Sequence, residues 1–392
     1  MRPIKMMVFM LGLLVMACNG KKEKEEVKEE ARIEPKERVH PTSLPLDSLN
    51  LPEGFKIEVY AEGVDGARSM AMGDDGTLFV STRNDKTVYA LQDLDGDFWA
   101  ENVKVLDSTL EVPNGIAFKD GDLYVAEVNR LLKYNDIEQN LDSLPDPEVI
   151  YDDYPTEFHH GWKYIAFGPD GKLYVPVGAP CNICDRTDED ERFNTITRMD
   201  PDGSNREIYA KGVRNTVGFT WHPETKDLWF TDNGRDMMGD DVPPCELNRA
   251  SAIGQHFGYP HCHGGIISDP EFGEGHPCAD FVAPVQPLGA HVAPLGVKFN
   301  TGDMFPSQYK GQVFMAEHGS WNRSSKVGYR ITMVTLNGNE AVSYEPFIDG
   351  WLNDDTQDQF GRPVDLLFLE DGSLLISDDF GDAIYRVSYV GV

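Results

Sequence analysis

One pattern of apolar and polar positions recurs six times along the chain. Each copy has a short apolar strand, a turn that usually contains glycine, and a second apolar strand of Leu, Val and aromatic residues. Asp-Gly turns between alternating apolar positions are typical of β-hairpins. The copies lie at residues 69–82, 115–127, 164–177, 218–232, 296–318 and 365–379.

The spacing of these hairpins predicts an all-β fold, a six-bladed β-propeller. The copies begin roughly 45 to 85 residues apart, and most are followed by a further strand-like segment. Such spacing suits antiparallel blades of about four strands, and a ring of blades leaves only short, protected sheet edges. A pair of β-sandwiches or another all-β solenoid is the alternative. We expect the extra length over residues 233–295 to form loops on one face, with no second domain.

The first residues have the pattern of an export signal. Arg2 and Lys5 precede an apolar run, residues 6–17, that is too short to span a bilayer. The run ends in the letters VMAC, which resemble a bacterial lipobox whose cysteine, Cys18, is lipidated. We expect a signal peptide over residues 1–17 and a lipid anchor at Cys18 in the bacterial cell envelope, in the periplasm or at the outer-membrane surface. A soluble secreted protein with Cys18 discarded or unmodified is the alternative.

The charge of the chain is concentrated beyond its N-terminal tract. The 392 residues carry a formal net charge of −31, but the tract 21–38 has equal numbers of acidic and basic residues. Such a polar tract cannot fold alone, so we expect a tether over residues 18–50 and the globular domain over residues 51–392. The acidic domain argues against nucleic-acid binding and against adsorption on anionic lipid. The lipid anchor is therefore the expected membrane contact.

Five cysteines follow Cys18, and an exported protein can form disulfides. We expect Cys181 to pair with Cys184 and Cys262 with Cys278, which leaves Cys245 free. A structural clip is the favoured interpretation of the Cys-x-x-Cys, and a redox-active pair is the alternative. No His follows Cys184, which excludes covalent c-type haem.

Basic and imidazole side chains recur at the hairpin ends. The second strand of each hairpin returns to the face where the first began, so these positions should meet at one mouth of the propeller. Before the first strands stand Arg68, Asn114, His160, Arg214 with Asn215, His291 and Arg362. After the second strands stand Arg83, Asn129, residues 233–236, His318 with Trp321 and Arg323, and Asp378 with Asp379.

In so acidic a domain, a cluster of cations predicts an anionic ligand. The planar fork of Arg suits carboxylates, and we expect Trp321 to stack on a flat ring. The alternative is that each Arg pairs with a local Asp or Glu at its blade end.

Two loops are rich in acidic residues. Residues 233–241, NGRDMMGDD, are punctuated by Gly and offer the carbonyl and carboxylate oxygens that calcium prefers. Residues 93–97, DLDGD, have their Gly at the wrong place for an EF-hand, so we interpret them as a hairpin turn.

Over residues 52–390 the chain resembles the pyrroloquinoline quinone (PQQ)-dependent sugar dehydrogenases. Within that family it is similar to the L-sorbosone or pyranose dehydrogenase branch, which is related to soluble glucose dehydrogenase. The family's fold is a six-bladed propeller, in agreement with the repeats. The most specific stretches are residues 159–184, 212–241, 316–324 and 361–379.

The resemblance implies that His160 is the general base, which takes the proton of a sugar hydroxyl while hydride passes to the quinone. Imidazole is mostly neutral at pH 7 and suits this role, and calcium would polarise the quinone carbonyl. The implied catalytic residues are His160 and Arg214. The implied cofactor contacts are Arg68, Asn215, Arg235, His318, Trp321, Arg323 and Arg362. The implied calcium ligands are the carbonyls of Gly234 and Arg235, with Asp240 and Asp241 for a further ion.

The chain departs from soluble glucose dehydrogenase at two cofactor contacts. His318 and Trp321 stand where that enzyme has a Lys, and Phe360 replaces one of its two late Arg residues. We expect Arg68 and Arg323 to compensate, and the sugar or sugar aldehyde that is oxidised stays open. Because the chain has no haem-binding segment, electrons would leave to a separate quinone or cytochrome.

Two other functions suit the same fold. A calcium-dependent sugar-lactone hydrolase would need an acidic mouth around a central metal, whereas this mouth carries Arg and His. A non-catalytic glycan-binding propeller has no need for His160 beside an Arg-Asn pair. Turnover of sugars with PQQ and calcium discriminates between the three.

Overall fold

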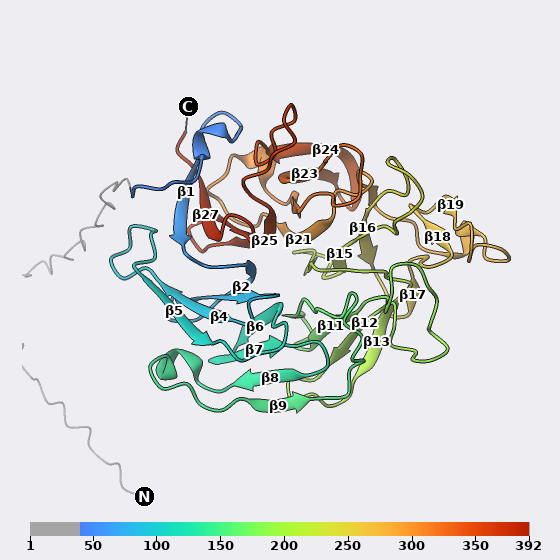
Figure 1. Cartoon of the computed structure of the whole chain (residues 1–392), viewed down its shortest axis with the longest axis horizontal. Helices are drawn as coiled ribbons and strands as arrows, with labels where there is room; N and C mark the ends of the chain where they lie inside the picture. Colours follow the sequence, from blue (N-terminus) through green and yellow to red (C-terminus); the bar gives the residue numbers. More distant parts are fainter. Residues whose placement is uncertain (1–39, 392) are drawn as a thin grey trace, which may run out of the picture. The chain divides into compact units, whose positions relative to one another are not determined.

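The computed structural model describes residues 40–391 of the chain. The predicted signal peptide, Cys18 and most of the predicted tether lie outside the described residues. The described residues belong to one compact unit, in which six sheets surround a common centre (Figure 1). The prediction of an all-β, six-bladed propeller is confirmed.

The first three blades follow chain order. Blade 1 contains β2 (Ala67–Met72), β3 (Leu78–Thr82), β4 (Val88–Gln92) and β5 (Asn102–Asp107). Blade 2 contains β6 (Gly115–Lys119), β7 (Asp122–Ala126), β8 (Leu131–Tyr134) and β9 (Glu148–Tyr151). Blade 3 contains β10 (Ala166–Phe167), β11 (Leu173–Val177), β12 (Thr195–Met199), β13 (Glu207–Lys211) and the later β17 (Gln255–His256), which pairs in parallel with β13.

The other three blades complete the ring. Blade 4 contains β14 (Phe219–Trp221), β15 (Leu228–Asp232), β16 (Glu246–Ala250) and β20 (Gln286–Pro287). Blade 5 contains β21 (Pro294–Phe299), β22 (Val313–Glu317), β23 (Arg330–Asn337) and β24 (Glu340–Ile348). Blade 6 contains β25 (Pro363–Phe368), β26 (Leu374–Asp378), β27 (Ala383–Tyr389) and the N-terminal β1 (Phe55–Glu62).

The ring is closed by its two ends. β1 pairs antiparallel with β27, from Phe55 opposite Tyr389 to Glu62 opposite Ala383. The first strand therefore supplies the outer edge of the last blade. This pairing covers a β27 edge that would otherwise be open to strands of other chains.

The core lies between the blades. The second strand of a blade is buried on both faces, as in β3, β15 and β26, because it is packed between two neighbouring sheets. On β3, Val80 packs with Ile384 of blade 6, and Phe79 on the opposite face packs with Ile116 of blade 2. Alternate residues of one strand thus join the two neighbouring blades.

Residues 233–295 are more ordered than the expected loops. They contain β16 and β20, which complete blade 4, and β17, which extends blade 3. They also form a two-stranded sheet of β18 (Cys262–His263) and β19 (Ile267–Ser268). The expectation of loops alone was wrong, because strands this short carry too few alternating positions to be recognised. The predicted disulfides Cys181–Cys184 and Cys262–Cys278 are confirmed, with Cys245 free and buried.

The packed domain begins before residue 51. Leu49 is buried in the core beneath blades 5 and 6, and the Asn50 side chain donates a hydrogen bond to Asp349. Apolar side chains over residues 44–51 explain this packing, so the packed domain includes the last residues of the predicted tether.

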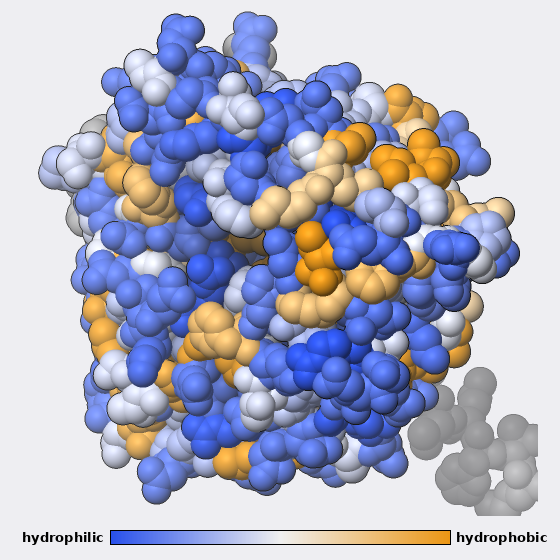
Figure 2. Space-filling view, turned by 45° about the vertical axis from the view of Figure 1, so that its right-hand side comes forward, coloured by the Kyte–Doolittle hydropathy of each residue, from blue (hydrophilic) through white to orange (hydrophobic). Residues whose placement is uncertain are grey.

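Helical structure in residues 40–391 is limited to four short 3-10 turns. They are η1 (Leu46–Ser48), η2 (Ile137–Asn140), η3 (Cys278–Asp280) and η4 (Ser307–Tyr309). No helix within that range is long and apolar enough to cross a membrane. The face in Figure 2 is largely hydrophilic, with hydrophobic residues in scattered groups, in keeping with the high net charge.

Candidate active site

Loops that flank blades 1, 3, 4, 5 and 6 meet around a cavity of about 470 Å³. This volume is within the range of small-molecule sites, roughly 300 to 1,000 Å³. We call it the basic cavity. Eight of the predicted site residues line it: Arg68, His160, Arg214, Asn215, Gly234, His318, Trp321 and Arg362.

His160 is fixed by its own backbone and by the turn after β11. It adopts a left-handed conformation with φ of 50°. A Cβ on Gly178 would lie 2.7 Å from the Cβ of His160, so only glycine permits this approach. The Nδ1 of His160 lies 2.9 Å from the carbonyl oxygen of Ala179. A carbonyl only accepts hydrogen bonds, so Nδ1 carries the proton and Nε2 of the neutral ring has the free lone pair.

The surroundings of His160 keep its ring neutral. Burial lowers the pKa of His160 well below its usual value, and the positive charge of Arg214 lowers it further. The neighbouring His159 also lines the cavity, and its pKa is lowered by burial and then by Arg214. His160 can therefore accept a proton at neutral pH.

A buried carboxylate holds the Arg214-Asn215 pair. At the end of β15, Asp232 accepts hydrogen bonds from the backbone N–H groups of Arg214 at 2.8 Å and Asn215 at 2.6 Å. Burial raises the pKa of Asp232 to about 6, although these hydrogen bonds favour the ionised form. The equivalent Asp378 of blade 6 accepts from the N–H of Arg362 at 2.8 Å. The sequence signal for both was an Asp at the end of a second strand, which our site prediction did not use.

On another wall of the cavity, one carboxylate bridges two predicted site residues. Asp379 contacts Arg68 at 2.8 Å and His318 at 2.7 Å. Burial opposes the ionisation of Asp379, but His318 and Arg68 hold its pKa well below the usual range. Burial lowers the pKa of His318 to about 4, so His318 is neutral at pH 7. The positive charge of Arg68 is therefore what keeps the pKa of Asp379 low at that pH.

Arg83 is the basic residue that our site prediction missed. It lines the cavity, with its guanidinium 4.8 Å from the ring centroid of Trp162. Within residues 40–391 it has no ion-pair partner. Burial and the nearby charges of Arg68 and Arg362 together lower the pKa of Arg83 to about 10, against the opposing effect of Asp379. Its position directly after β3 was the available signal.

Two predicted cofactor contacts have side chains outside this cavity. Arg235 pairs with Asp269 at 2.5 Å and with Glu271 at 3.1 Å. Arg323 pairs with Asp241 at 2.8 Å. Each of these two guanidinium groups therefore has a carboxylate partner away from the basic cavity, supplied by a different loop.

The predicted calcium ligands are separated. Gly234 lines the basic cavity, whereas Asp240 and Asp241 line a second cavity of about 550 Å³ together with Arg323. Asp240 accepts hydrogen bonds from the backbone N–H of Ser324 and, through its own carbonyl, from Arg323. The two aspartates therefore fix a loop at this second cavity.

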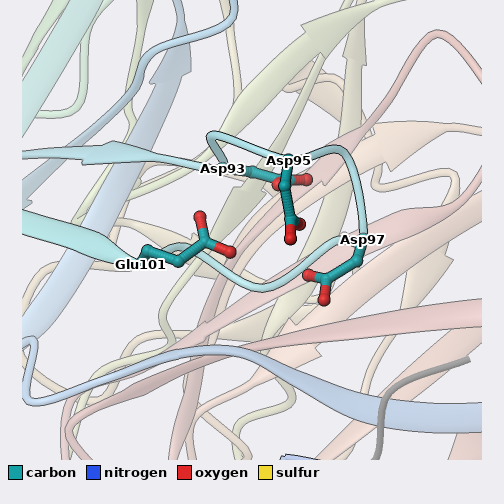
Figure 3. A group of neighbouring side chains, drawn as sticks. All are labelled: Asp93, Asp95, Asp97 and Glu101. Carbon is teal, nitrogen blue, oxygen red and sulfur yellow. The ribbon is translucent and has the colours of Figure 1, made fainter. Parts of the chain in front are cut away.

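The acidic loop after β4 is the predicted hairpin turn, since it connects the paired strands β4 and β5. Within residues 40–391 it also holds the one group of acidic side chains whose ligand oxygens lie within 4.8 Å of one another, those of Asp93, Asp95, Asp97 and Glu101 (Figure 3). Asp93 accepts backbone hydrogen bonds from Gly96 and Phe98, which are interactions of the turn itself.

Comparison with known proteins identifies the family. The model of the glucose/sorbosone dehydrogenase family matches residues 122–322, and a TrAA12-like model matches residues 267–390. An uncharacterized protein of Borreliella burgdorferi is 32% identical over 359 residues, which cover 87% of this chain and 91% of that protein. This chain belongs to the glucose/sorbosone dehydrogenase family.

Solved structures share the propeller of this dehydrogenase family member. The calcium structure of a family AA12 carbohydrate-active enzyme from Trichoderma reesei has a TM-score of 0.78 at 21% identity, over 90% of this chain and 99% of that one. The holo PQQ domain of pyranose dehydrogenase from Coprinopsis cinerea has a TM-score of 0.74 at 18% identity, over 87% of this chain and 97% of that domain. The PQQ-bound aldose sugar dehydrogenase of Streptomyces coelicolor has a TM-score of 0.63 at 20% identity, over 86% of this chain and 99% of that one. At these identities the likeness establishes the fold.

The Asp379 bridge leads to a prediction on stability. Asp379→Asn leaves Arg68, which is 2% exposed, without its carboxylate, and we expect a loss of about 3 kcal/mol in the free energy of unfolding at pH 7. Because the pKa of Asp379 is depressed on folding, its contribution is present above the unfolded carboxyl pKa, about 4. The contribution is lost as the pH falls through the lower folded pKa.

Denaturant unfolding of both proteins at several pH values measures this effect. The difference between them should shrink as the pH is lowered below about 4. Asp142→Asn is a matched control, since Asp142 is exposed and pairs only at the surface with Lys104. A difference that stays constant with pH contradicts the assigned role.

Proposed function

We propose that this protein oxidises a sugar or sugar aldehyde with bound PQQ and calcium. The observation that carries the proposal is one cavity in which the charges of Arg68 and Arg362 lower the pKa of Arg83, near a neutral His160. Within residues 40–391, neither Arg83 nor Arg362 has an ion-pair partner, and the Arg362 guanidinium donates to backbone carbonyls. A wall of such like charges is costly unless an anion binds there.

The residues of the basic cavity suit a flat ligand with several carboxylates. Arg83 and Arg362 supply planar donors for carboxylate oxygens. Trp162 and Trp321 line the same space and supply aromatic faces. The PQQ-bound and holo forms named for the Streptomyces and Coprinopsis relatives support this choice of ligand.

Calcium suits the loop at Gly234, which lines the cavity beside Asn215 and Asp236. Backbone carbonyls, amide oxygens and carboxylates are its usual ligands. The calcium structure named for the Trichoderma relative supports this choice of ion.

In the proposed reaction, His160 acts on the sugar. Its Nε2 accepts the proton of the hydroxyl at the carbon that is oxidised, while Nδ1 keeps its hydrogen bond to Ala179 and holds the ring in place. Arg214 disfavours protonation of the free ring, which keeps the base available. PQQ, when bound, supplies the quinone that accepts the hydride, with calcium as Lewis acid for its carbonyl.

PQQ affinity tests the basic cavity. Arg83→Ala removes a guanidinium that has no carboxylate partner in the described residues, and we expect the dissociation constant of PQQ to rise by roughly tenfold to a hundredfold. Quenching of tryptophan fluorescence on PQQ titration measures the constant, since Trp162 and Trp321 line the cavity. Arg323→Ala is the control and should leave the constant unchanged. Equal effects of both variants contradict the assignment.

Turnover tests the reaction and the base. With PQQ and calcium added, the protein should reduce an artificial electron acceptor with at least one member of a panel of aldoses, ketoses and sugar aldehydes. His160→Ala should lower kcat by roughly 10² to 10⁴, whereas the exposed His276→Ala should not.

The pH profile of the same reaction checks the state of His160. Because the pKa of the free base is lowered, kcat/KM should hold from pH 8 down through the usual His pKa of about 6.5 and decline only at lower pH. Absence of both PQQ binding and turnover favours a glycan-binding propeller or a lactone hydrolase.

We also propose that Cys18 carries the lipid anchor and that electrons leave to a separate quinone or cytochrome in the cell envelope. In cells, Cys18→Ser should abolish incorporation of labelled palmitate and move the protein from the membrane to the soluble fraction. Two or more acyl chains bind membranes far more firmly than one. Unchanged membrane association of the variant contradicts the anchor.

A further inference from the structure

The side chain of Arg214 is oriented mainly by one residue. Its Nε and one terminal nitrogen donate to the carbonyl oxygen of Asn182 at 3.3 and 3.1 Å, and the same terminal nitrogen donates to the Asn182 side-chain oxygen at 2.6 Å. A fourth bond goes to the carbonyl of Asn233 at 3.1 Å. The nearest carboxylate, that of Asp236, lies 3.6 Å away. The hydrogen bonds that fix the guanidinium thus go to neutral acceptors, and Asp236 forms only a longer ion pair with it.

The loop that carries Asn182 is held by a disulfide and by the side chain of Tyr259. It lies inside the four-residue loop closed by the Cys181–Cys184 disulfide. The hydroxyl of Tyr259 donates to the carbonyl of Cys184 at 3.1 Å and lies 3.4 Å from its backbone nitrogen. Tyr259 is buried, and its backbone N–H bonds to Gly212 beside the Arg214 segment.

The same segment also holds the proposed base. The backbone N–H of Ala179 donates to the carbonyl of Arg214 at 2.8 Å, and the carbonyl of Ala179 accepts from Nδ1 of His160. Residues 178–184 therefore contact His160 at one end and Arg214 along their length. They set the position of Arg214 relative to His160.

We propose that Asn182, held in the Cys181–Cys184 disulfide loop, is a positioning residue that orients Arg214 with neutral acceptors and leaves its charge for an anionic ligand in the basic cavity. The identity of that ligand as PQQ rests on the proposed function, whereas the contact between Asn182 and Arg214 does not. The disulfide acts by keeping the Asn182 carbonyl in reach of the guanidinium.

The experiment compares the chemical reactivity of individual arginines in the full chain, without cofactor. Phenylglyoxal modification is followed by peptide mapping in the wild type, Asn182→Ala, Asn182→Asp and the double variant Cys181→Ser/Cys184→Ser. Arg214 should react about tenfold faster in Asn182→Ala, the size expected for loss of one hydrogen bond to a charged group. In the double cysteine variant it should also react faster, because the carbonyl is released. Arg68 and Arg362 are internal references and should not change.

Asn182→Asp separates position from charge. It keeps the oxygen acceptor, so Arg214 should stay as protected as in the wild type, but its negative charge should weaken PQQ binding about tenfold. Asn182→Ala should weaken binding in the wild-type background and have no further effect when Arg214 is already Ala.

The two proposals can fail separately. An Arg214 reactivity that is the same in the wild type and Asn182→Ala, relative to Arg68 and Arg362, overturns the positioning role. Wild-type protein that fails to bind PQQ overturns the proposed cofactor and leaves the reactivity result to decide the role of Asn182. Where the cysteine variant does not fold, the two Asn182 variants, which keep the loop closed, decide the question.

Discussion

Hydrogen bonds from backbone N–H groups to buried carboxylates hold the site residues of blades 4 and 6 against the strands of the propeller. Asp232 and Asp378, both at the last position of a second strand, bind the N–H groups of the residues that lead into the first strand of the same blade. Each carboxylate thus joins the two ends of one hairpin and fixes the backbone of Arg214, Asn215 and Arg362. Because the carboxylates bind the backbone and not the side chains, the side chains of these residues are free to face the cavity.

The electrostatics of the cavity depend on which cations meet a carboxylate. Arg68 shares Asp379 with His318, Arg214 is held mainly by amide and carbonyl oxygens, and Arg83 lies over an aromatic ring. Arg235 and Arg323, by contrast, each have their own acid. A protein with net charge −31 therefore keeps a small basic region by orienting several of its guanidinium groups with neutral partners. Such a region gives an anion a favourable site against the field of the whole molecule.

The base and the cations are part of one structural unit. The turn after β11 contacts both His160 and Arg214, and Gly178 permits the close approach of the His160 backbone. The charge of Arg214 in turn lowers the pKa of His160. The proposed anion binding and the proposed proton transfer would therefore be coupled through the residues of this turn. Membership of the glucose/sorbosone dehydrogenase family agrees with this arrangement.

The sequence by itself determined the hairpins, their number and the face on which the site residues meet, because these follow from local alternation, turn chemistry and the order of strands in a blade. It suggested the disulfide pairs, which the tertiary structure then decided. The sequence did not determine which of the arginines near the basic cavity pair with a carboxylate and which do not. Arg68 meets Asp379 across 311 positions, Arg323 meets Asp241 across 82, and Arg235 meets Asp269 across 34. Arg83 has no carboxylate partner in residues 40–391, although Asp85 stands only two positions away in the sequence. Only the closed ring decided these pairings, since charge neutralisation depends on distances between side chains that folding brings together from remote parts of the chain.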